Sequence, residues 1–187
     1  MKISIIGTGY VGIVTGACFA AKGHHVLCVD IDQAKVDLIN NGTAPIYERG
    51  LDDLLKRHAG DRLRATTDLA DAVQQTDLSM IAVGTPFDGN EIDLTYIKNV
   101  SKQLGYALKA KPGYHVVLVK STVVPGTTDD VVLPILEQAS GKKAGVDFGV
   151  GMNPEFLTEG EAVKEVMDPD GIVLGGLDQR TLERRGA

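Results

Sequence analysis

The chain has 187 residues, of which 43% are hydrophobic and 24% are charged, and its formal net charge is -6. These proportions are ordinary for a soluble globular protein, and the length suffices for one good core. The acidic balance argues against a general nucleic-acid binder, because such a protein needs a basic face to displace counterions. It does not exclude a nucleotide ligand, since a few local donors can hold a phosphate.

Neither a membrane segment nor a metal site is expected from the sequence. No apolar run reaches membrane-spanning length, and the N-terminus enters a predicted strand without a signal-peptide cleavage site. The two cysteines, Cys18 and Cys28, have no metal-binding or redox spacing, so buried reduced thiols are expected. Together these features predict a cytoplasmic protein that contacts no membrane.

Apolar runs alternate with helical patterns along nearly the whole chain. The first half predicts, in chain order, a strand at 2–7, a helix at 10–23, a strand at 25–30, helices at 32–42 and 50–60, a strand at 62–68 and a helix at 69–75. The second half predicts a strand at 78–86, a helix at 93–111, a strand with its exit loop at 115–127, a helix at 128–140 and strand-like stretches at 146–157 and 171–176. The last stretch, 177–187, starts like a helix and then stops, as if a longer protein continued beyond it.

This alternation predicts the fold class. Strands that alternate with helices form a parallel sheet covered on both faces. The short, fully apolar runs at 4–7 and 78–84 are typical of strands buried on both sides. We therefore expect an α/β fold, a Rossmann-type doubly wound and mostly parallel sheet with helices on both faces, in one domain over residues 1–187.

A glycine-rich turn follows the first predicted strand and opens the first predicted helix. Gly7, Gly9 and Gly12 match G-x-G-x-x-G, the dinucleotide-binding pattern. The first glycine permits the tight turn, the second lets a pyrophosphate approach the backbone, and the third lets the helix pack closely on the strand. The start of the helix then offers free N–H groups and a positive dipole end to the phosphates. A glycine-rich turn without a ligand is the alternative.

Asp30 ends the second predicted strand, about twenty residues after the glycines, where a carboxylate accepts hydrogen bonds from ribose hydroxyls. A carboxylate at this position also repels the extra phosphate of NADP, and residues 31–34 contain no arginine. The sequence therefore favours NAD. Lys35 lies one helical turn further on and is a candidate for the ribose or adenine side, although a solvated helix lysine fits the sequence equally well.

Three further loops follow strands that should end at the same edge of the sheet. These loops are Val83–Pro86, Lys120–Thr127 and Asn153–Gly160. Each combines hydroxyls or carboxylates with Gly or Pro, which fix the shape of a loop. Because ligands of such sheets bind at the carboxyl ends of the strands, we expect the three loops to line the site. The alternative is that they are turns only.

These loops carry a resemblance to a known family. The segments GTGYVG, APIYERGL, VGTP, KSTVVPGTT and NPEFLTEGEAV resemble, in this order, the nucleotide-sugar 6-dehydrogenases, which include UDP-glucose 6-dehydrogenase and GDP-mannose 6-dehydrogenase. The resemblance implies an NAD-dependent enzyme that oxidises the C6 alcohol of a nucleotide sugar to a carboxylate with two NAD. It implies that the aldehyde stays on a cysteine as a thiohemiacetal, becomes a thioester and is hydrolysed. It also implies a homodimer for the full-length protein.

The resemblance also assigns roles to single residues. For the cofactor it implies Tyr10 and Val11 along the pyrophosphate, Asp30 and Lys35 near the adenosine ribose, and Val83, Thr85, Ser121 and Thr122 on the nicotinamide side. For the chemistry it implies Glu155 as the proton donor or acceptor in thioester hydrolysis, with Thr122 placing the water. For the substrate it implies the backbone of Phe156 and Leu157 at the sugar, and Glu159 in contact with both substrate and cofactor.

The sequence departs from the family pattern at two positions and in length. Arg49 replaces an expected proline, and Gly171 replaces an expected arginine. The family's cysteine nucleophile, central helix and nucleotide-sugar domain are expected downstream of Ala187, so the chain by itself is expected to be inactive.

Three alternatives remain open at this point. The chain is either half of such an enzyme, a non-catalytic NAD-binding module, or an unrelated Rossmann enzyme such as a methyltransferase or a 3-hydroxyacid dehydrogenase. Between substrates, residues 43–48 and the stretch 159–170 favour UDP-glucose. Residues 140–151 resemble the GDP-mannose enzymes, so the sequence does not decide between them.

Overall fold

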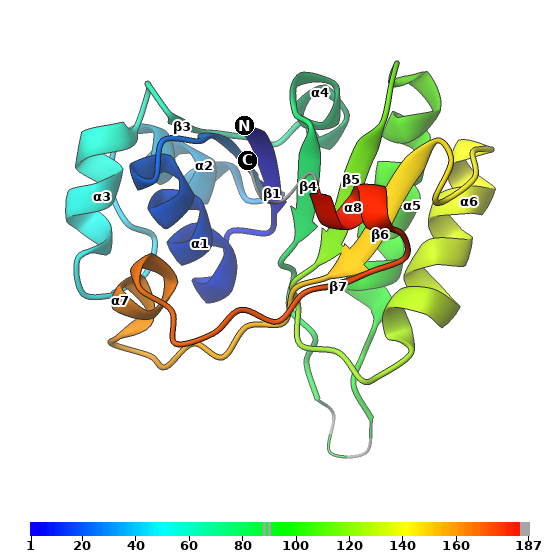
Figure 1. Ribbon diagram of the computed structural model, residues 1–187. Helices are drawn as coiled ribbons and strands as arrows, with labels where there is room; N and C mark the ends of the chain where they lie inside the picture. The colour runs from blue at the N-terminus through cyan, green and yellow to red at the C-terminus, as the bar shows by residue number, and fades with distance from the viewer. Residues whose placement is uncertain (88, 90, 184–187) are drawn as a thin grey trace.

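The computed structural model describes residues 1–87, 89 and 91–183, and within these ranges a seven-stranded sheet has the order β3-β2-β1-β4-β5-β6-β7 (Figure 1). Its strands are β1 (Lys2–Ile6), β2 (His25–Val29), β3 (Leu63–Thr66), β4 (Leu78–Ile81), β5 (His115–Val119), β6 (Phe148–Met152) and β7 (Gly175–Gly176). All neighbouring strands are parallel except β6 and β7. The order reverses between β1 and β4, which confirms the predicted doubly wound fold.

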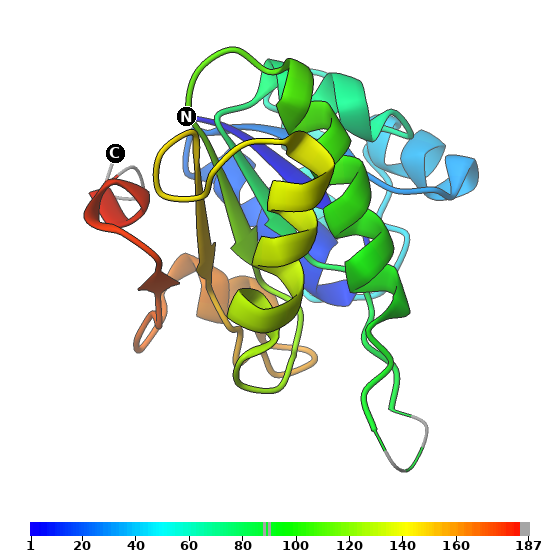
Figure 2. The ribbon, with the colours of Figure 1, turned by 90° about the vertical axis from the view of Figure 1, so that its right-hand side faces the viewer.

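The helices pack on both faces of the sheet (Figure 2). They are α1 (Tyr10–Ala21), α2 (Gln33–Asn40), α3 (Leu51–His58), α4 (Leu69–Gln75), α5 (Thr95–Ala110), α6 (Leu133–Ser140), α7 (Ala162–Met167) and α8 (Gln179–Glu183), with a π-helical turn η1 (Thr127–Val132) ahead of α6. In Figure 2, α5 and α6 lie side by side over one face, while α7 and α8 lie on the opposite side. Strands β1 to β6 run parallel, so their carboxyl ends lie at one edge of the sheet, and β7 runs in the opposite direction.

Two apolar cores explain this layering. Residues of α1, α3 and α7 share one buried cluster with Ile5 of β1 and Leu118 of β5. Residues of α4, α5 and α6 share the other cluster with Ile6 and Val119, whose side chains point to the opposite face. Adjacent strand residues alternate between faces, so a strand covered on both sides is apolar throughout. Burial of side chains on both faces drives the sheet to the centre of the molecule.

The structure departs from the expected elements near the C-terminus. The stretch predicted as a strand at 171–176 pairs only over two residues and runs antiparallel to β6. Ile172 and Val173 there are exposed, so their apolar character does not report burial in a sheet. The strand expected at 146–157 ends at Met152, where the polar loop begins. Helix α7 was not predicted, because six residues are too few for a helical period to show.

The expected beginning of a helix after residue 177 is confirmed by α8, while residues 184–187 lie outside the described part of the chain. Within the described ranges, no helix is both long and apolar enough to cross a membrane.

Candidate functional site

The glycine-rich turn between β1 and α1 has two glycines that its packing requires and one that it does not. Gly7 has a φ of 101°, and a Cβ there would lie 2.7 Å from the carbonyl oxygen of Ala82. A Cβ on Gly12 would lie 1.9 Å from the carbonyl oxygen of Gly7, so the turn and the helix are in direct contact. A Cβ on Gly9 would meet nothing within 4 Å. Gly7 and Gly12 thus close the turn, and Gly9 faces open space that a ligand can enter.

Helix α1 begins directly at this open space. Gly9 is its N-cap and offers no capping side chain, and the first turn carries no acidic residue. The first N–H groups of a helix have no partner within the helix, and its N-terminus carries a partial positive charge. The space beside Gly9 and the N–H groups of Tyr10 and Val11 therefore fit a phosphate.

Asp30 lies at the end of β2 and is held by the same turn. Its Oδ2 accepts hydrogen bonds from the backbone N–H (2.8 Å) and hydroxyl (2.5 Å) of Thr8, and its Oδ1 accepts one from the N–H of Asp32 (3.0 Å). Lys35 Nζ lies 3.9 Å from Oδ2. Burial raises the pKa of Asp30, but these hydrogen bonds and the Lys35 charge outweigh it and hold the pKa below its ordinary value. Asp30 is therefore an ionised acceptor with a fixed orientation.

Thr8 was not singled out by the sequence analysis, although it fixes the carboxylate that was. Its position inside the glycine motif is the signal that points to it, because the turn brings its N–H toward the neighbouring strand. Ile31, the residue after Asp30, is 93% exposed. This leaves an apolar surface next to the carboxylate, on the side where the adenosine is expected.

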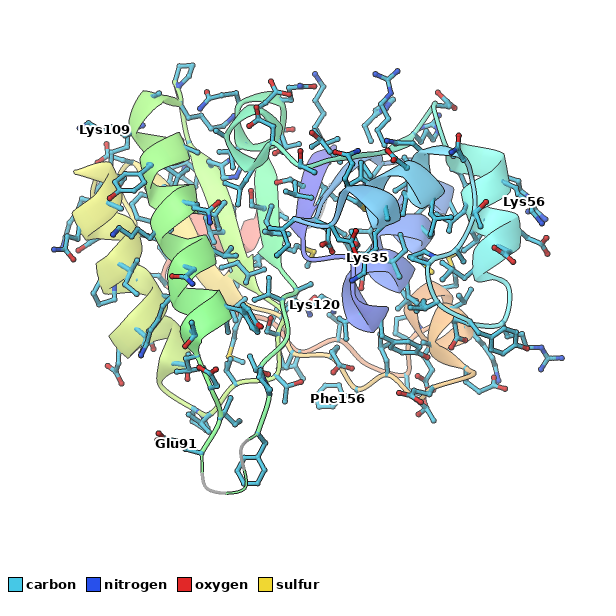
Figure 3. All side chains as sticks on the ribbon, turned by 180° about the vertical axis from the view of Figure 1, so that it is seen from behind. Lys35, Lys56, Glu91, Lys109, Lys120 and Phe156 are labelled. Atoms are coloured by element: carbon cyan, nitrogen blue, oxygen red, sulfur yellow. The ribbon has the colours of Figure 1, made fainter. Side chains whose placement is uncertain are left out.

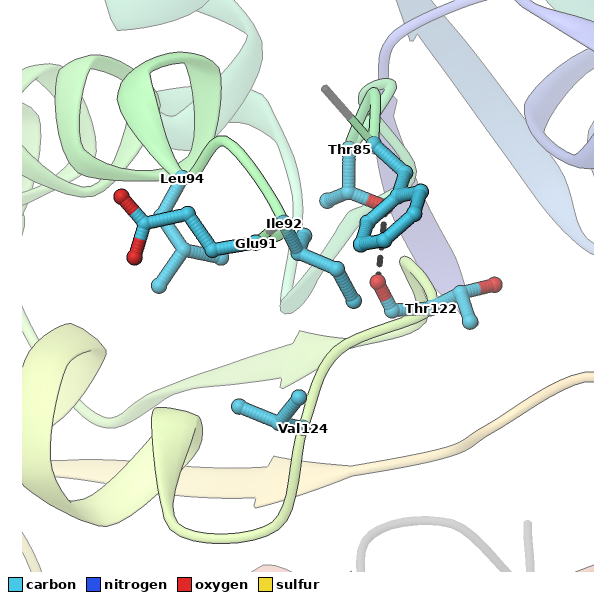
Figure 4. Close-up of a pocket in the computed structure, with 7 residues that line it drawn as sticks. Thr85, Glu91, Ile92, Leu94, Thr122 and Val124 are labelled. Carbon is cyan, nitrogen blue, oxygen red and sulfur yellow. Dashed lines mark hydrogen bonds between the residues drawn. The ribbon is translucent and has the colours of Figure 1, made fainter. Parts of the chain in front are cut away.

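The loops after β4 and β5 are joined by two hydroxyl groups. Thr85 donates a hydrogen bond to the carbonyl oxygen of Thr122 (2.7 Å), which Figure 4 shows as a dashed line. Ser121 donates one to the carbonyl oxygen of Val83 (2.6 Å). The predicted residues of the two loops are therefore brought together, and two of their hydroxyls hold the loops in place.

A cavity of about 720 Å³ opens beside these loops (Figure 4). It is lined by Thr85, Phe87, Glu91, Ile92, Leu94, Thr122 and Val124. Phe87 pairs with Ile92 in an antiparallel bridge, so the segment after β4 folds back toward the start of α5. Thr85 and Thr122, which were predicted to lie on the nicotinamide side, thus line a partly apolar pocket.

Glu155 follows β6 and meets Thr122 from the neighbouring loop. The hydroxyl of Thr122 donates to Oε1 of Glu155 over 3.4 Å, and the N–H of Leu157 donates to Oε2 over 2.7 Å. The first of these bonds is long and the second is short. The carboxylate is therefore anchored at one oxygen and loosely held at the other.

Lys120 belongs to a loop that was expected to line the site, but the sequence analysis gave it no role of its own. It directly follows β5, is only 7% exposed, and its Nζ donates to Oδ1 of Asn153 over 3.2 Å. Burial lowers the pKa of Lys120, and the negative charge of Glu155 acts in the opposite direction. Figure 3 shows Lys120 close to the centre of the molecule. A lysine at the end of an otherwise apolar strand was the available signal, since lysine is rarely buried without a partner.

Lys120, Asn153 and Glu155 also line a second, mostly apolar cavity of about 750 Å³ on the α1 side of the sheet. Phe156 and Leu157 line the same cavity. Phe156 is 70% exposed, and Figure 3 shows it at the outside of the loop. Leu157 is half-buried and packs against the α1-side core.

The two cysteines lie inside the core. Cys18 and Cys28 are fully buried, which confirms the expected buried thiols. Burial raises the pKa of each thiol to about 12. Since the thiolate is the reactive form, this burial disfavours both cysteines as nucleophiles.

Fold and site together define a dinucleotide-binding α/β domain of the dehydrogenase type. The family model described as "UDP-glucose/GDP-mannose dehydrogenase family, NAD binding domain" matches residues 1–186. The chain belongs to this family, and NAD is its cofactor. An unrelated Rossmann enzyme is thereby excluded.

The relatives of the chain carry the names of two related enzymes. It is 53% identical over 181 residues to GDP-mannose 6-dehydrogenase of Pseudomonas syringae pv. tomato, covering 96% of the chain and 41% of that protein. It is 50% identical over 184 residues to UDP-glucose 6-dehydrogenase AglM of Haloferax volcanii, covering 98% and 43%.

A solved structure shows the same fold. The ternary complex of GDP-mannose dehydrogenase from Pseudomonas aeruginosa superposes with a TM-score of 0.96 and 49% identity, covering 99% of the chain and 43% of that protein. The chain therefore spans about two fifths of the length of the relatives it matches.

Proposed function

We propose that this chain is the single NAD-binding domain, residues 1–187, of a nucleotide-sugar 6-dehydrogenase that converts a C6 alcohol to a carboxylate. One observation carries the proposal. The glycine turn with Asp30 and the Thr122–Glu155 pair lie at the same edge of the sheet, so a dinucleotide bound by the first extends toward the second. The covalent step on a cysteine requires residues outside this chain, because both of its own thiols are buried.

The cofactor-binding residues fit NAD. Gly9 leaves room for the pyrophosphate, the N–H groups at the start of α1 hold its charge, and the ionised Asp30 accepts from the ribose. Asp30 also disfavours a 2′-phosphate at the same place. The bound NAD supplies a hydride acceptor. The Thr85 and Ser121 bonds keep the nicotinamide-side loops in one arrangement, which reduces the ordering required when a ligand binds.

Glu155 is proposed to take the proton of the hydrolytic water. Its Oε2 is anchored by the N–H of Leu157, which leaves Oε1 with the single long bond from Thr122. A water placed by the Thr122 hydroxyl can therefore reach Oε1. The ammonium of Lys120 lines the same cavity as the carboxylate, and the negative charge of Glu155 favours that ammonium. Glu159 is exposed on the same loop and is proposed to face substrate and cofactor.

The proposed substrate is a hexose linked to a nucleoside diphosphate. Residues 43–48 and 159–170 favoured UDP-glucose, while relatives named GDP-mannose 6-dehydrogenase, at 51–53% identity, are slightly more similar than AglM and TuaD, two relatives named UDP-glucose 6-dehydrogenase, at 50% and 44%. We propose GDP-mannose as the first candidate and UDP-glucose as the second. Assays of the full-length protein with both substrates side by side distinguish them. If the protein turns over neither substrate, this assignment is contradicted. A homodimer is proposed for the full-length protein.

Calorimetric titration of the chain with NAD and with NADP tests the cofactor half of the proposal. We expect NAD to bind at least about ten-fold more tightly, because Asp30 gains a hydrogen bond with NAD and a charge repulsion with NADP. The same chain mixed with NAD and either nucleotide sugar is expected to form no NADH. Equal affinity for both cofactors, or measurable turnover, contradicts the proposal.

A further inference from the structure

One of the segments that resemble the family has no role in the proposed function. The stretch APIYERGL, residues 44–51, runs from the loop after α2 to the first residue of α3 and does not directly follow a strand of the sheet. Within it Tyr47 is 92% exposed, whereas the neighbouring Glu48 is only 5% exposed. A carboxylate is rarely buried to this extent unless other groups hold it. The contacts of Glu48 therefore indicate what the segment does.

Glu48 connects two segments that lie on opposite sides of it in the sequence. Its Oε2 accepts a hydrogen bond from the hydroxyl of Tyr10, the first residue of α1. The same oxygen accepts from the N–H of Gly160 over 2.8 Å, and that N–H also lies 3.3 Å from the Tyr10 hydroxyl. Two donors thus meet at one oxygen, although 38 and 112 residues separate Glu48 from them.

The protonation states keep this arrangement intact at neutral pH. Burial raises the pKa of Glu48, but hydrogen bonds from the Tyr10 hydroxyl and from the N–H groups of Gly160, Arg49 and Val163 outweigh it and hold the pKa below its ordinary value. Burial and the bond to Glu48 raise the pKa of Tyr10 to about 12. The carboxylate is therefore ionised while the phenol keeps its proton, which is the state in which both donors bind the same anion.

The two connected segments belong to different halves of the site. Tyr10 follows Gly9, whose open side is the proposed place of the pyrophosphate. Gly160 follows Glu159, the proposed contact to substrate and cofactor. A shift of either segment changes its distance to Oε2, and a buried anion strongly disfavours the loss of a donor. The position of one segment is therefore tied to that of the other.

We propose that Glu48 is a positioning residue that couples cofactor binding at the glycine turn to the ordering of the Asn153–Gly160 loop. The inference rests on the proposed function, because it takes the space beside Gly9 as the cofactor site. It assigns to the APIYERGL segment the task of transmitting occupancy of one site to the other. Coupling of this kind is reciprocal, so an ordered loop also favours cofactor binding.

The test compares hydrogen exchange at the Gly160 amide, followed by NMR in the 187-residue chain, with and without saturating NAD. In the unsubstituted chain we expect NAD to slow this exchange at least about five-fold, because binding restrains the segment that holds Glu48. In Glu48→Gln, exchange without NAD should be about ten-fold faster, since a charge-assisted bond is lost. The slowing by NAD should then disappear.

Tyr10→Phe is the second variant, because it removes one hydroxyl and retains the ring. In this variant too, NAD should no longer slow hydrogen exchange at the Gly160 amide. It carries the test if Glu48→Gln does not fold. Glu161→Gln is the matched control, since Glu161 is an exposed carboxylate of the same region that interacts with Arg49 and Lys164, and it should behave as the unsubstituted chain. A purely structural role would lower the thermal midpoint of the variants but leave the slowing by NAD in place.

The outcomes separate this inference from the proposed function. If the unsubstituted chain binds no NAD, the proposed function fails and the coupling fails with it. If it binds NAD but a folded Glu48→Gln or Tyr10→Phe keeps the slowing at Gly160, only the coupling is overturned. Loss of the slowing in the variants, with the control unchanged, supports the coupling.

Discussion

The two ends of the parallel strands use the same types of polar residue in opposite ways. Toward the amino end, Ser4, Ser79 and His115 on three adjacent strands are all fully buried. The hydroxyl groups of Ser4 and Ser79 lie 2.6 Å apart, and Ser79 Oγ lies 2.8 Å from Nε2 of His115. The other ring nitrogen lies 3.1 Å from the carbonyl oxygen of Thr76. The polar atoms there are partners of one another.

At the carboxyl end Thr8, Lys120, Ser121 and Asn153 are buried, but other polar groups are only partly enclosed. Asp30 and Glu155 are half-buried, and Thr122 is exposed. Their bonds run between loops, and the Thr122–Glu155 bond is 3.4 Å long. A buried network that is fully paired contributes to stability, whereas polar groups with free capacity remain available to a ligand. The contrast therefore separates residues that hold the fold from residues that bind and react.

The largest effect is expected from Glu155→Gln in a full-length protein that carries this domain. Glutamine keeps the shape of glutamate but cannot take a proton, so hydrolysis should stop after the redox steps. Steady-state turnover should fall by a factor on the order of 100 or more, while a first burst of NADH remains. Intact-protein mass spectrometry should then show the sugar attached to the enzyme. An unmodified mass together with a lost burst contradicts the hydrolytic role.

Asp30→Ala in the isolated chain should weaken NAD binding by about 1–3 kcal/mol, because it leaves the ribose hydroxyls without their acceptor. Calorimetry measures this directly. Asp37→Ala, an exposed aspartate on α2, is the matched control and should leave the affinity unchanged. The assignment of the carboxylate fails if the two variants bind NAD equally well.

Ser79→Ala is expected to act in the opposite way, on stability and not on binding. It leaves Ser4 and His115 without their shared buried partner, so the free energy of unfolding should fall by about 1–2 kcal/mol. Urea unfolding gives this value, and calorimetry of the folded variant should give an unchanged affinity for NAD. A clear loss of NAD affinity would remove the distinction between the two ends of the strands.

The smallest effect is expected from the acid dependence of stability. The pKa of Asp30 lies below its ordinary value of 3.8 in the folded chain, so its contribution is present above pH 3.8 and is lost as the pH falls through the folded pKa. The difference in unfolding free energy between the unsubstituted chain and Asp30→Asn should therefore shrink as the pH falls below 3.8. Urea unfolding at several pH values measures this difference in free energy. A difference that grows as the pH falls would contradict the prediction.

The sequence predicted those features that local pattern determines. The glycine turn, Asp30 and the loops at Thr85 and Glu155 follow from strands, turns and the rule that ligands bind at carboxyl ends. The roles of Glu48 and Lys120 were not predicted, because they arise from burial and from partners in other segments. Lys120 meets Asn153 33 residues away, and no local period encodes that distance. Helix α7 escaped because its six residues are too few to show a helical period.

The central claim is that the carboxyl edge of the sheet binds NAD, and NMR of the chain titrated with NAD tests it most directly. We expect NAD to change the amide shifts of residues 7–12, of Asp30 and of the loops around Thr85 and Ser121. We expect no changes at the amino-end residues Ser4, Ser79 and His115. Changes centred on the amino end, or no changes at saturating NAD, would contradict it.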